Sequence, residues 1–213
     1  MLIFQVVLDR KVIIIGYSGH AYVVAEATEL CGVAPTHYTE KNEVDANPFS
    51  LGFLGFEGEM NFIENNIDNQ FLLGIGDNKI RFKTAFKINQ KGGKLITIIH
   101  PDAKISKYSK IGEGTFIARG VLVNPFVEIG NYSILNTGCI VDHDCKLDEA
   151  VHIAPGAVLA GNVKVGKCSF IGANSVVKQD VKIGENVIIG AGSVIINDVP
   201  SNKTFVGNPG KEI

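Results

Sequence analysis

The sequence predicts two dissimilar parts in series, a small α/β domain over residues 1–95 and a coiled parallel β-helix over residues 96–213. Two observations lead to this prediction. The first part contains strand, glycine-turn and helix patterns, and the second contains a six-residue repeat of aliphatic side chains. The composition agrees, because 24 glycines, no tryptophan and 46% hydrophobic residues favour tightly turned β structure over a helical bundle.

The N-terminal part opens with a Rossmann-like βαβ pattern. Lys11–Ile15 predicts a short buried strand, Gly16–His20 forms a glycine turn, and residues 21–31 predict a helix that ends at Gly32. The backbone amides at such a helix start can hold a phosphate, because glycine has no Cβ to block its approach. The third glycine of the dinucleotide fingerprint is missing, so NAD is not the expected ligand.

A second strand is predicted over Phe71–Ile75, and it ends in the polar turn Gly76–Asn78 before another helical stretch. Ligands in open α/β sheets collect beyond the carboxyl ends of the strands, so this turn is expected to lie near the first one. A third strand is predicted over Lys94–Ile99, where the chain passes into the repeat. Residues 40–60 are predicted to be rich in loops.

The repeat begins at Ile105 and has an aliphatic residue at every sixth position. The sixteen positions are Ile105, Ile111, Ile117, Val123, Ile129, Leu135, Val141, Leu147, Ile153, Leu159, Val165, Ile171, Val177, Ile183, Ile189 and Ile195. Only 60 of the 213 residues are Ile, Leu or Val, so composition alone does not produce an unbroken run of this length. A six-residue period fits neither a helix nor simple strand alternation, but it fits a short strand followed by a corner.

Three such strands make one triangular coil of 18 residues, and successive coils stack at the strand spacing of about 4.8 Å. Residues that are 18 positions apart should therefore lie directly above one another. Gly161 follows His143 at this spacing, and Pro155, Ala173 and Ala191 form a second column.

The segment around His143 contains the residues best suited to acid–base chemistry. An imidazole near neutral pKa can remove a proton from an amine or hydroxyl as that group attacks a thioester. Either Asp144 or Asp142 can orient the ring and stabilise its protonated form. The backbone N–H of Gly161 can stabilise an oxyanion one coil away. The alternatives are that His143 is a solvated corner residue and that Gly161 serves only the corner.

This segment, LNTGCIVDHDCKLDEAVHIAPGAVLAGN, resembles the hexapeptide-repeat sugar acetyltransferases, and so do KVIIIGYSGHA, GIGDNKIR and FVGNPGK. That family includes the sialic acid O-acetyltransferases and the UDP-4-amino-sugar N-acetyltransferase of bacillosamine synthesis. The resemblance implies a left-handed β-helix, a homotrimer with ligand clefts between subunits, and acetyl-CoA as co-substrate without a metal. It also assigns the general base to His143.

Further roles follow from the resemblance. The positions implied to contact acetyl-CoA are His152, Ala173, Ala191 and Lys211. Those implied to bind the nucleotide sugar are Ser18, Gly19, His20, Gly76 and Asn136, with Asp77 and Asn78 as neighbours. The chain departs from the family pattern where Asp144 replaces the usual Glu and where Gly210 replaces Ala. The acidic pair of some members has no clean counterpart, although Glu40 lies close to its position.

The expected function is therefore direct acetyl transfer from acetyl-CoA to the amine or hydroxyl of a nucleotide-activated sugar. His143 removes the proton and the Gly161 N–H stabilises the tetrahedral intermediate, without a covalent acyl-enzyme. O-acetylation of sialic acid is the alternative within the family. A zinc enzyme of the carbonic anhydrase type would need three histidine ligands, of which the repeat offers His143 and His152. A non-catalytic solenoid that binds a sugar nucleotide is the third alternative.

Charge and hydropathy argue against other partners. The formal net charge of −2, with both signs mixed along the chain, argues against nucleic acid and anionic lipid as partners. The opening MLIFQVVLDR does not fit a signal peptide, and no later run approaches the roughly 20 apolar residues of a membrane span. Without a CxxC pair, the cysteines are expected to be reduced thiols of a cytoplasmic protein. They are Cys31, Cys139, Cys145 and Cys168.

Overall fold

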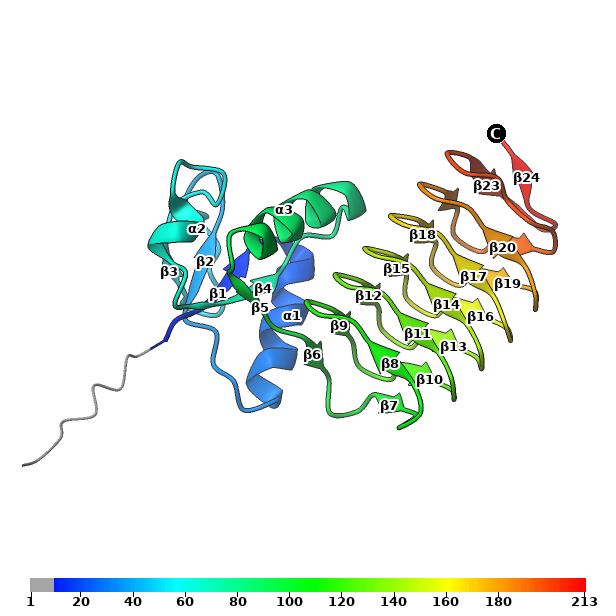
Figure 1. Ribbon diagram of the computed structural model, residues 1–213, viewed down its shortest axis with the longest axis horizontal. Helices are drawn as coiled ribbons and strands as arrows, with labels where there is room; N and C mark the ends of the chain where they lie inside the picture. The colour runs from blue at the N-terminus through cyan, green and yellow to red at the C-terminus, as the bar shows by residue number, and fades with distance from the viewer. Residues whose placement is uncertain (1–9) are drawn as a thin grey trace, which may run out of the picture.

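The computed structural model describes residues 10–213, so the expectation for most of MLIFQVVLDR falls outside the described residues. Its N-terminal domain is a five-stranded parallel sheet in the order β3-β2-β1-β4-β5 (Figure 1). The strands are β1 (Val12–Ile15), β2 (His37–Thr39), β3 (Gly52–Phe53), β4 (Gln70–Leu73) and β5 (Lys94–Leu95). The helices are α1 (Gly19–Leu30), α2 (Phe62–Asn65) and α3 (Asn78–Gln90).

This sheet confirms the Rossmann-like pattern read from the sequence. Every residue of β1 is buried, as expected for a central parallel strand that is covered on both faces. The predicted helix over residues 21–31 is observed as α1, shifted by one or two residues. The Asp77 side chain caps α3 by accepting a hydrogen bond from the backbone N–H of Ile80 at 2.8 Å.

The single strand predicted over Lys94–Ile99 is wrong, because the chain changes sheets inside this segment. β5 completes the N-terminal sheet, whereas β6 (Ile98–Ile99) begins the β-helix. The Ile96 N–H still donates to the carbonyl of Phe71, but the Ile98 N–H donates to that of Thr115. The short strand β3 lies in the segment predicted to be loop-rich.

The β-helix consists of two- or three-residue strands that form three faces. The docked face, which meets the N-terminal domain, contains β6, β9 (Phe116–Ile117), β12 (Ile134–Leu135), β15 (His152–Ile153), β18 (Phe170–Ile171), β21 (Ile188–Ile189), β23 (Thr204–Val206) and β24 (Lys211–Glu212). The apolar face contains β7 (Lys104–Ile105), β10 (Leu122–Val123), β13 (Ile140–Val141), β16 (Val158–Leu159), β19 (Val176–Val177) and β22 (Val194–Ile195). The charged face contains β8 (Lys110–Ile111), β11 (Glu128–Ile129), β14 (Lys146–Leu147), β17 (Lys164–Val165) and β20 (Lys182–Ile183).

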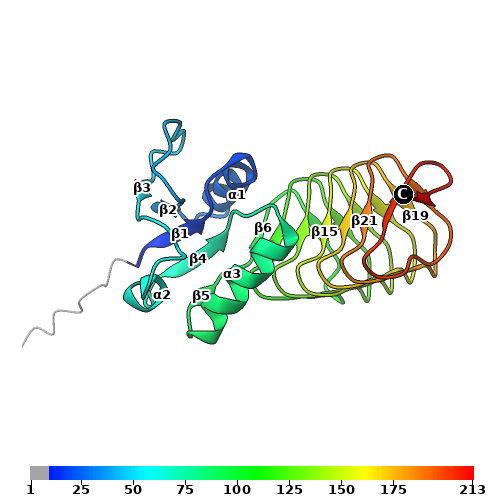
Figure 2. The same ribbon diagram turned by 90° about the horizontal axis from the view of Figure 1, so that it is seen from above.

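The register matches the predicted stacking. From β6 to β22, strand partners lie 18 residues apart, as in the pairing of Ile134 with His152 and of Ile140 with Val158, whereas β21 and β23 pair at a spacing of 16 residues. The second residue of each repeat strand points inward, and the resulting column of aliphatic side chains forms the core of the prism. Figure 2 shows the coils stacked in a row, with the N-terminal domain at one end.

The outward residues give the three faces different surfaces. The outward residues of the docked face are Ile98, Phe116, Ile134, His152, Phe170 and Ile188. Those of the apolar face are Leu122, Ile140, Val158, Val176 and Val194. Those of the charged face are Lys110, Glu128, Lys146, Lys164 and Lys182. Phe116, Ile134 and His152 are buried although they point outward, because the N-terminal domain covers them. In contrast, Leu122 and Val176 are 42% and 41% exposed.

Candidate active site

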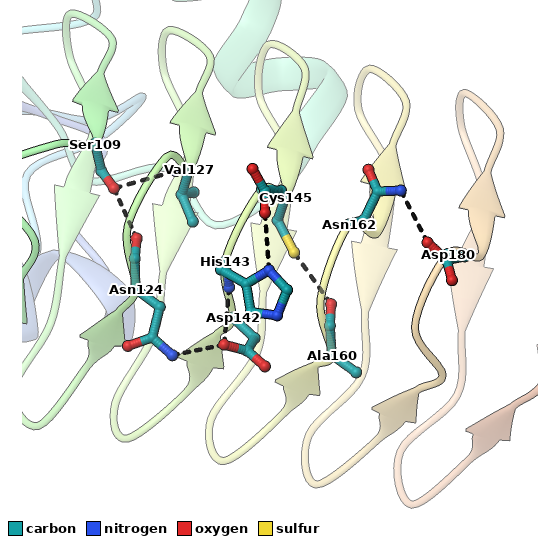
Figure 3. A network of polar contacts seen from close by, with 10 residues as sticks. Ser109, Asn124, Val127, Asp142, His143, Cys145, Ala160, Asn162 and Asp180 are labelled. Atoms are coloured by element: carbon teal, nitrogen blue, oxygen red, sulfur yellow. Dashed lines mark hydrogen bonds and ion pairs between the residues drawn. The ribbon is translucent and has the colours of Figure 1, made fainter.

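His143 lies at the corner between β13 and β14, where the apolar face meets the charged face. Its Nδ1 atom is 2.8 Å from a carboxylate oxygen of Asp144. Asp142 instead accepts hydrogen bonds from the His143 backbone N–H at 2.8 Å and from the Asn124 side chain at 2.6 Å (Figure 3). Of the two carboxylates that the sequence offered as partners of the ring, Asp144 contacts the imidazole and Asp142 holds the corner backbone.

These carboxylates make His143 a stronger base. The hydrogen bond to Asp144 raises the pKa of His143, and the negative charge of Asp142 raises it further. The His143 and Asp144 side chains are 58% and 55% exposed, so they are open to a ligand or to another protein surface. Since Asp144 occupies Nδ1, the Nε2 atom is the one available to accept a proton.

Gly161 lies against the ring of His143, one coil further along. A Cβ atom built on Gly161 would come within 2.6 Å of the His143 Cε1 atom and 2.7 Å of Nε2. Only glycine leaves room for the imidazole in this position. Among residues 10–213, the Gly161 N–H has no hydrogen-bond acceptor, so this donor is free for a ligand.

Two other histidines, the half-buried His20 and the buried His152, form a pair where the N-terminal domain meets the β-helix. The rings of His20 on α1 and His152 on β15 lie 6.3 Å apart, and the ring of His20 packs edge-on against Phe116. Burial lowers the pKa of His20 to about 4 and that of His152 to about 3, with a smaller contribution from the charge of Arg81. Both rings are therefore neutral at physiological pH.

The rings of His20 and His152 each have one nitrogen without a hydrogen-bond partner among residues 10–213. Nε2 of His152 lies 3.3 Å from the side-chain nitrogen of Asn136. Within the part of the chain that the structure describes, Nδ1 of His152 and Nε2 of His20 have no hydrogen-bond partner. Buried polar atoms are nearly always paired in proteins, so these two nitrogens are suited to meet a bound molecule or water.

A cavity of about 410 Å³ lies at the carboxyl edge of the N-terminal sheet, and we call it the sheet-edge cavity. Gly16 and Ser18 of the first turn and Gly76 of the second contribute to its wall. Sequence reasoning missed Phe56 and Glu57, which also line it, because they come from the segment predicted to be loop. Its further lining residues include Glu40, Lys41, Gly74, Ile80, Thr84 and Lys87.

A second cavity of about 510 Å³ lies between α3 and the docked face, and we call it the interdomain cavity. Its wall includes Asp77 and Asn78 from the N-terminal domain and Phe170 and Ile188 from the β-helix. Phe170 and Ile188 were also missed, although their spacing of 18 and 36 residues from His152 places them in the same outward column. Gly76 borders both cavities.

The remaining expected residues do not line either cavity. Ala173 and Ala191 occupy corners between the docked and apolar faces, and Lys211 lies in β24 near the C-terminus. Gly19 begins α1 beside the sheet-edge cavity. No residue of the His143 corner lines either cavity. One chain therefore brings His143, Asp144 and Gly161 together but does not join them to the two cavities.

Among residues 10–213, no three His, Cys, Asp or Glu side chains form a group that could hold a metal ion, and no helix is long and apolar enough to cross a membrane. All four cysteines are free, and Cys139 and Cys145 are buried.

Comparisons with known proteins define the class of this site. The model of the PglD N-terminal domain matches residues 11–88, and that of the bacterial transferase hexapeptide matches residues 144–179 and 162–197. The UDP-N-acetylbacillosamine N-acetyltransferase of Bacillus subtilis is 42% identical over 50 residues, which is 24% of this chain and 23% of that protein. The GDP-perosamine N-acetyltransferase of Escherichia coli O157:H7 is 34% identical over 76 residues, or 36% of this chain and 34% of that protein.

Similarity to solved structures extends over nearly the whole chain. PerB from Caulobacter crescentus, in complex with CoA and GDP-perosamine, is 34% identical with a TM-score of 0.89, covering 96% of this chain and 98% of that one. The acetyltransferase domain of PglB from Neisseria gonorrhoeae, in complex with acetyl coenzyme A, is 32% identical with a TM-score of 0.89, covering 96% and 99%.

The fold and these matches define an acetyl-CoA-dependent acyltransferase. The chain belongs to the family of hexapeptide-repeat sugar-nucleotide acetyltransferases. The resemblance read from the sequence is thereby confirmed, as is the left-handed coil that it implied.

Proposed function

We propose that this protein transfers the acetyl group of acetyl-CoA to the amine of a nucleotide-linked amino sugar, with His143 as the general base. The contact between His143 and Asp144 is the observation that carries the proposal, together with the adjacent Gly161 N–H, which has no acceptor among residues 10–213. The full-length structural relatives are N-acetyltransferases or acetyltransferase domains, and PerB was solved with CoA and a GDP-linked amino sugar. This similarity favours an amine over a hydroxyl as acceptor.

The reaction is a direct transfer. The sugar nitrogen attacks the thioester carbon while Nε2 of His143 takes the proton that the nitrogen loses. The carbonyl oxygen becomes an oxyanion, and the Gly161 N–H donates a hydrogen bond to it. When the C–S bond breaks, the imidazolium returns the proton to the sulfur of CoA, so the base is restored for the next cycle.

The two cavities provide places for the ligands. The sheet-edge cavity lies at the N-terminus of α1, where Gly19 and the free backbone amides favour the diphosphate of the nucleotide sugar. Lys41 and Lys87 add positive charge to its wall. The interdomain cavity lies along the outward column of His152, and its apolar residues Phe170 and Ile188 suit the pantetheine arm of acetyl-CoA.

A second copy of the chain would bring the base to these cavities. His143 lies at one edge of the apolar face, and Ala173 and Ala191 lie at the opposite edge. If three apolar faces surround a common axis, the His143 corner of one copy lies beside the Ala173 corner of the next. The uncovered aliphatic residues of this face, such as Leu122 and Val176, support such a homotrimer. We propose a cytoplasmic location, where acetyl-CoA and sugar nucleotides are made.

An acceptor comparison tests the reaction. The protein is incubated with acetyl-CoA and either a GDP- or UDP-linked 4-amino sugar or free sialic acid, and products are identified by mass spectrometry. Acetylation of the amino sugar is expected, whereas exclusive acetylation of sialic acid would show that the alternative within the family is correct.

A pair of histidine variants tests the base. His143→Ala should lower kcat by about 10²- to 10⁴-fold, the usual contribution of a general base. His37→Gln on β2, which lines neither cavity, should retain activity. Full activity of His143→Ala would rule out this mechanism, and light scattering of both variants checks that the assembly is unchanged.

A further inference from the structure

Arg81 is buried where the N-terminal domain meets the β-helix. Its side chain is 1% exposed, although arginine is rarely buried in proteins. Its Nε atom donates to the carbonyl of Tyr132 at 2.7 Å, and Nη2 donates to the carbonyl of Ala150 at 2.9 Å. Tyr132 and Ala150 are corner residues of consecutive coils, so one guanidinium binds two coils of the β-helix.

The other guanidinium contacts are made within the N-terminal domain, to the loop between β4 and α3 and to the first residue of α3. Nη1 donates to the carbonyl of Gly76 at 2.9 Å and to that of Ile75 at 3.3 Å. Nη2 also donates to the side-chain oxygen of Asn78 at 2.9 Å. The amide nitrogen of Asn78 in turn donates to the carbonyls of Cys168 and Ser169. The loop is thus attached to a third coil as well.

We propose that Arg81 is a positioning residue for the reaction, because its guanidinium fixes the Gly76 loop, the shared wall of both cavities, to consecutive coils of the β-helix. This inference rests on the proposed function, which assigns the two substrates to those cavities. Lysine cannot replace the arrangement, since an ammonium group lacks the planar fork that reaches carbonyls on opposite sides at once.

The charge of Arg81 supports the same role. All five of its acceptors are neutral oxygens, and among residues 10–213 no carboxylate forms an ion pair with it. Burial lowers the pKa of Arg81 to about 10, so it remains protonated at neutral pH. This positive charge helps to keep the nearby rings of His20 and His152 neutral.

Steady-state kinetics of Arg81→Lys and Arg81→Gln test the proposal, with Ile88→Val as the matched control. Ile88 is a buried residue of the same helix that lines neither cavity, so its truncation loosens the packing of α3 without removing a contact to the Gly76 loop. Both Arg81 variants should raise the KM for the nucleotide sugar by about tenfold or more, because small misplacements of a substrate have large kinetic effects. Ile88→Val should lower the melting temperature and leave KM within about twofold.

The outcomes separate this inference from the proposed function. If the wild-type protein shows no thermal shift with GDP- or UDP-linked amino sugars, the proposed function fails. The positioning role is refuted by a different result. In that case the wild type binds the nucleotide sugar, both Arg81 variants have the wild-type KM for it, and they lose only thermal stability, as Ile88→Val does.

Should neither Arg81 variant fold, Asn78→Ala removes one of the five acceptors of Arg81 and also the hydrogen bonds that Asn78 donates to the carbonyls of Cys168 and Ser169, so it weakens the same attachment to the β-helix. A raised KM for the nucleotide sugar in that variant supports the role, and an unchanged KM refutes it. Histidine NMR provides an independent readout in any folded Arg81→Gln protein. A pKa of His152 that rises above its wild-type value is expected, because the charge of Arg81 lowers this pKa in the wild type; within residues 10–213, His20 is the other titratable group that acts on it.

Discussion

The surroundings of the exposed His143 and of the His20–His152 pair shift the histidine pKa in opposite directions. At His143, a bonded carboxylate raises the pKa and solvent surrounds the ring. At His20 and His152, burial lowers the pKa, and no carboxylate within residues 10–213 is paired with either ring. A histidine becomes a base or a neutral hydrogen-bonding group according to the carboxylates and solvent around it. The comparison predicts which variants change proton transfer and which change only binding.

Apart from loss of the base itself, the largest effect is expected at the close contact between His143 and Gly161. Gly161→Ala would introduce a Cβ atom 2.6 Å from the His143 ring, so the imidazole must move away from its partner. We expect kcat to fall by about 10²-fold, comparable to the loss of an oxyanion donor, with little change in melting temperature. Steady-state kinetics and calorimetry check this.

A matched glycine variant controls for general corner effects. Gly138→Ala alters another coil corner, where nothing lies within 4 Å of an added Cβ, although its φ of +66° makes alanine somewhat strained. This variant should lose some stability and keep its kcat. Equal losses of kcat in both glycine variants would show that the loss comes from disturbing a coil corner and not from the contact with His143.

The next effect concerns the pH dependence of the rate. The neutral form of His143 is the base, so kcat/KM should rise with pH through the raised pKa of His143. In Asp144→Asn the hydrogen bond that mainly raises this pKa loses its charge, so the rising limb should move to lower pH. We expect the plateau rate to fall about tenfold, because the imidazolium loses its stabilising partner. A pH–rate profile measures both changes, and a limb that does not move would argue against Asp144 as the partner.

The buried pair should respond in the opposite way, through stability. The folded pKa of His152, about 3, lies below the unfolded value near 6.5. As pH falls from about 6.5 towards 3, the unfolded chain binds a proton that the folded chain does not, so the free energy of unfolding decreases by up to about 1.4 kcal/mol per pH unit. His152→Gln should flatten this decline and raise the KM for acetyl-CoA several-fold while leaving the kinetic pKa of His143 unchanged. Thermal unfolding between pH 4 and 7 checks the slope, and an unaltered slope would contradict the burial argument.

Much of the corner site was predictable because the β-helix converts sequence spacing into distance. The six-residue period predicted the β-helix, and the 18-residue spacing predicted that Gly161 lies against His143. The choice between Asp142 and Asp144 was not predictable, since both flank the histidine and the side-chain direction depends on the left-handed φ of 61° at Asp144. The change of sheets within Lys94–Ile99 leaves no signal either, because Leu95 and Ile96 are as apolar as Ile98 and Ile99.

The interdomain region was harder to predict, since it depends on how two separate folds pack. Arg81 falls in the helical stretch that the sequence predicts after Gly76–Asn78, but its burial follows from the carbonyls of Tyr132 and Ala150, about 50 and 70 residues away along the chain. Phe56 and Glu57 enter the sheet-edge cavity from a segment without a periodic pattern. Local patterns predict the elements, whereas pairs from unrelated elements need the packed structure.

The smallest effect is expected at Asp142, and it separates the two carboxylates of the corner. Asp142 bonds the His143 backbone and Asn124 rather than the imidazole, so Asp142→Asn preserves the acceptor oxygen and removes only the charge. Since that charge contributes less to the raised pKa of His143 than the Asp144 bond does, the rate limb should shift to lower pH by less than in Asp144→Asn. We expect kcat to change by about twofold to threefold, because the ring keeps its carboxylate partner. Parallel pH–rate profiles of the two variants measure this. A larger shift in Asp142→Asn than in Asp144→Asn would mean that bound substrates turn the imidazole towards Asp142. Asp142, rather than Asp144, would then be the carboxylate partner of the ring during the reaction.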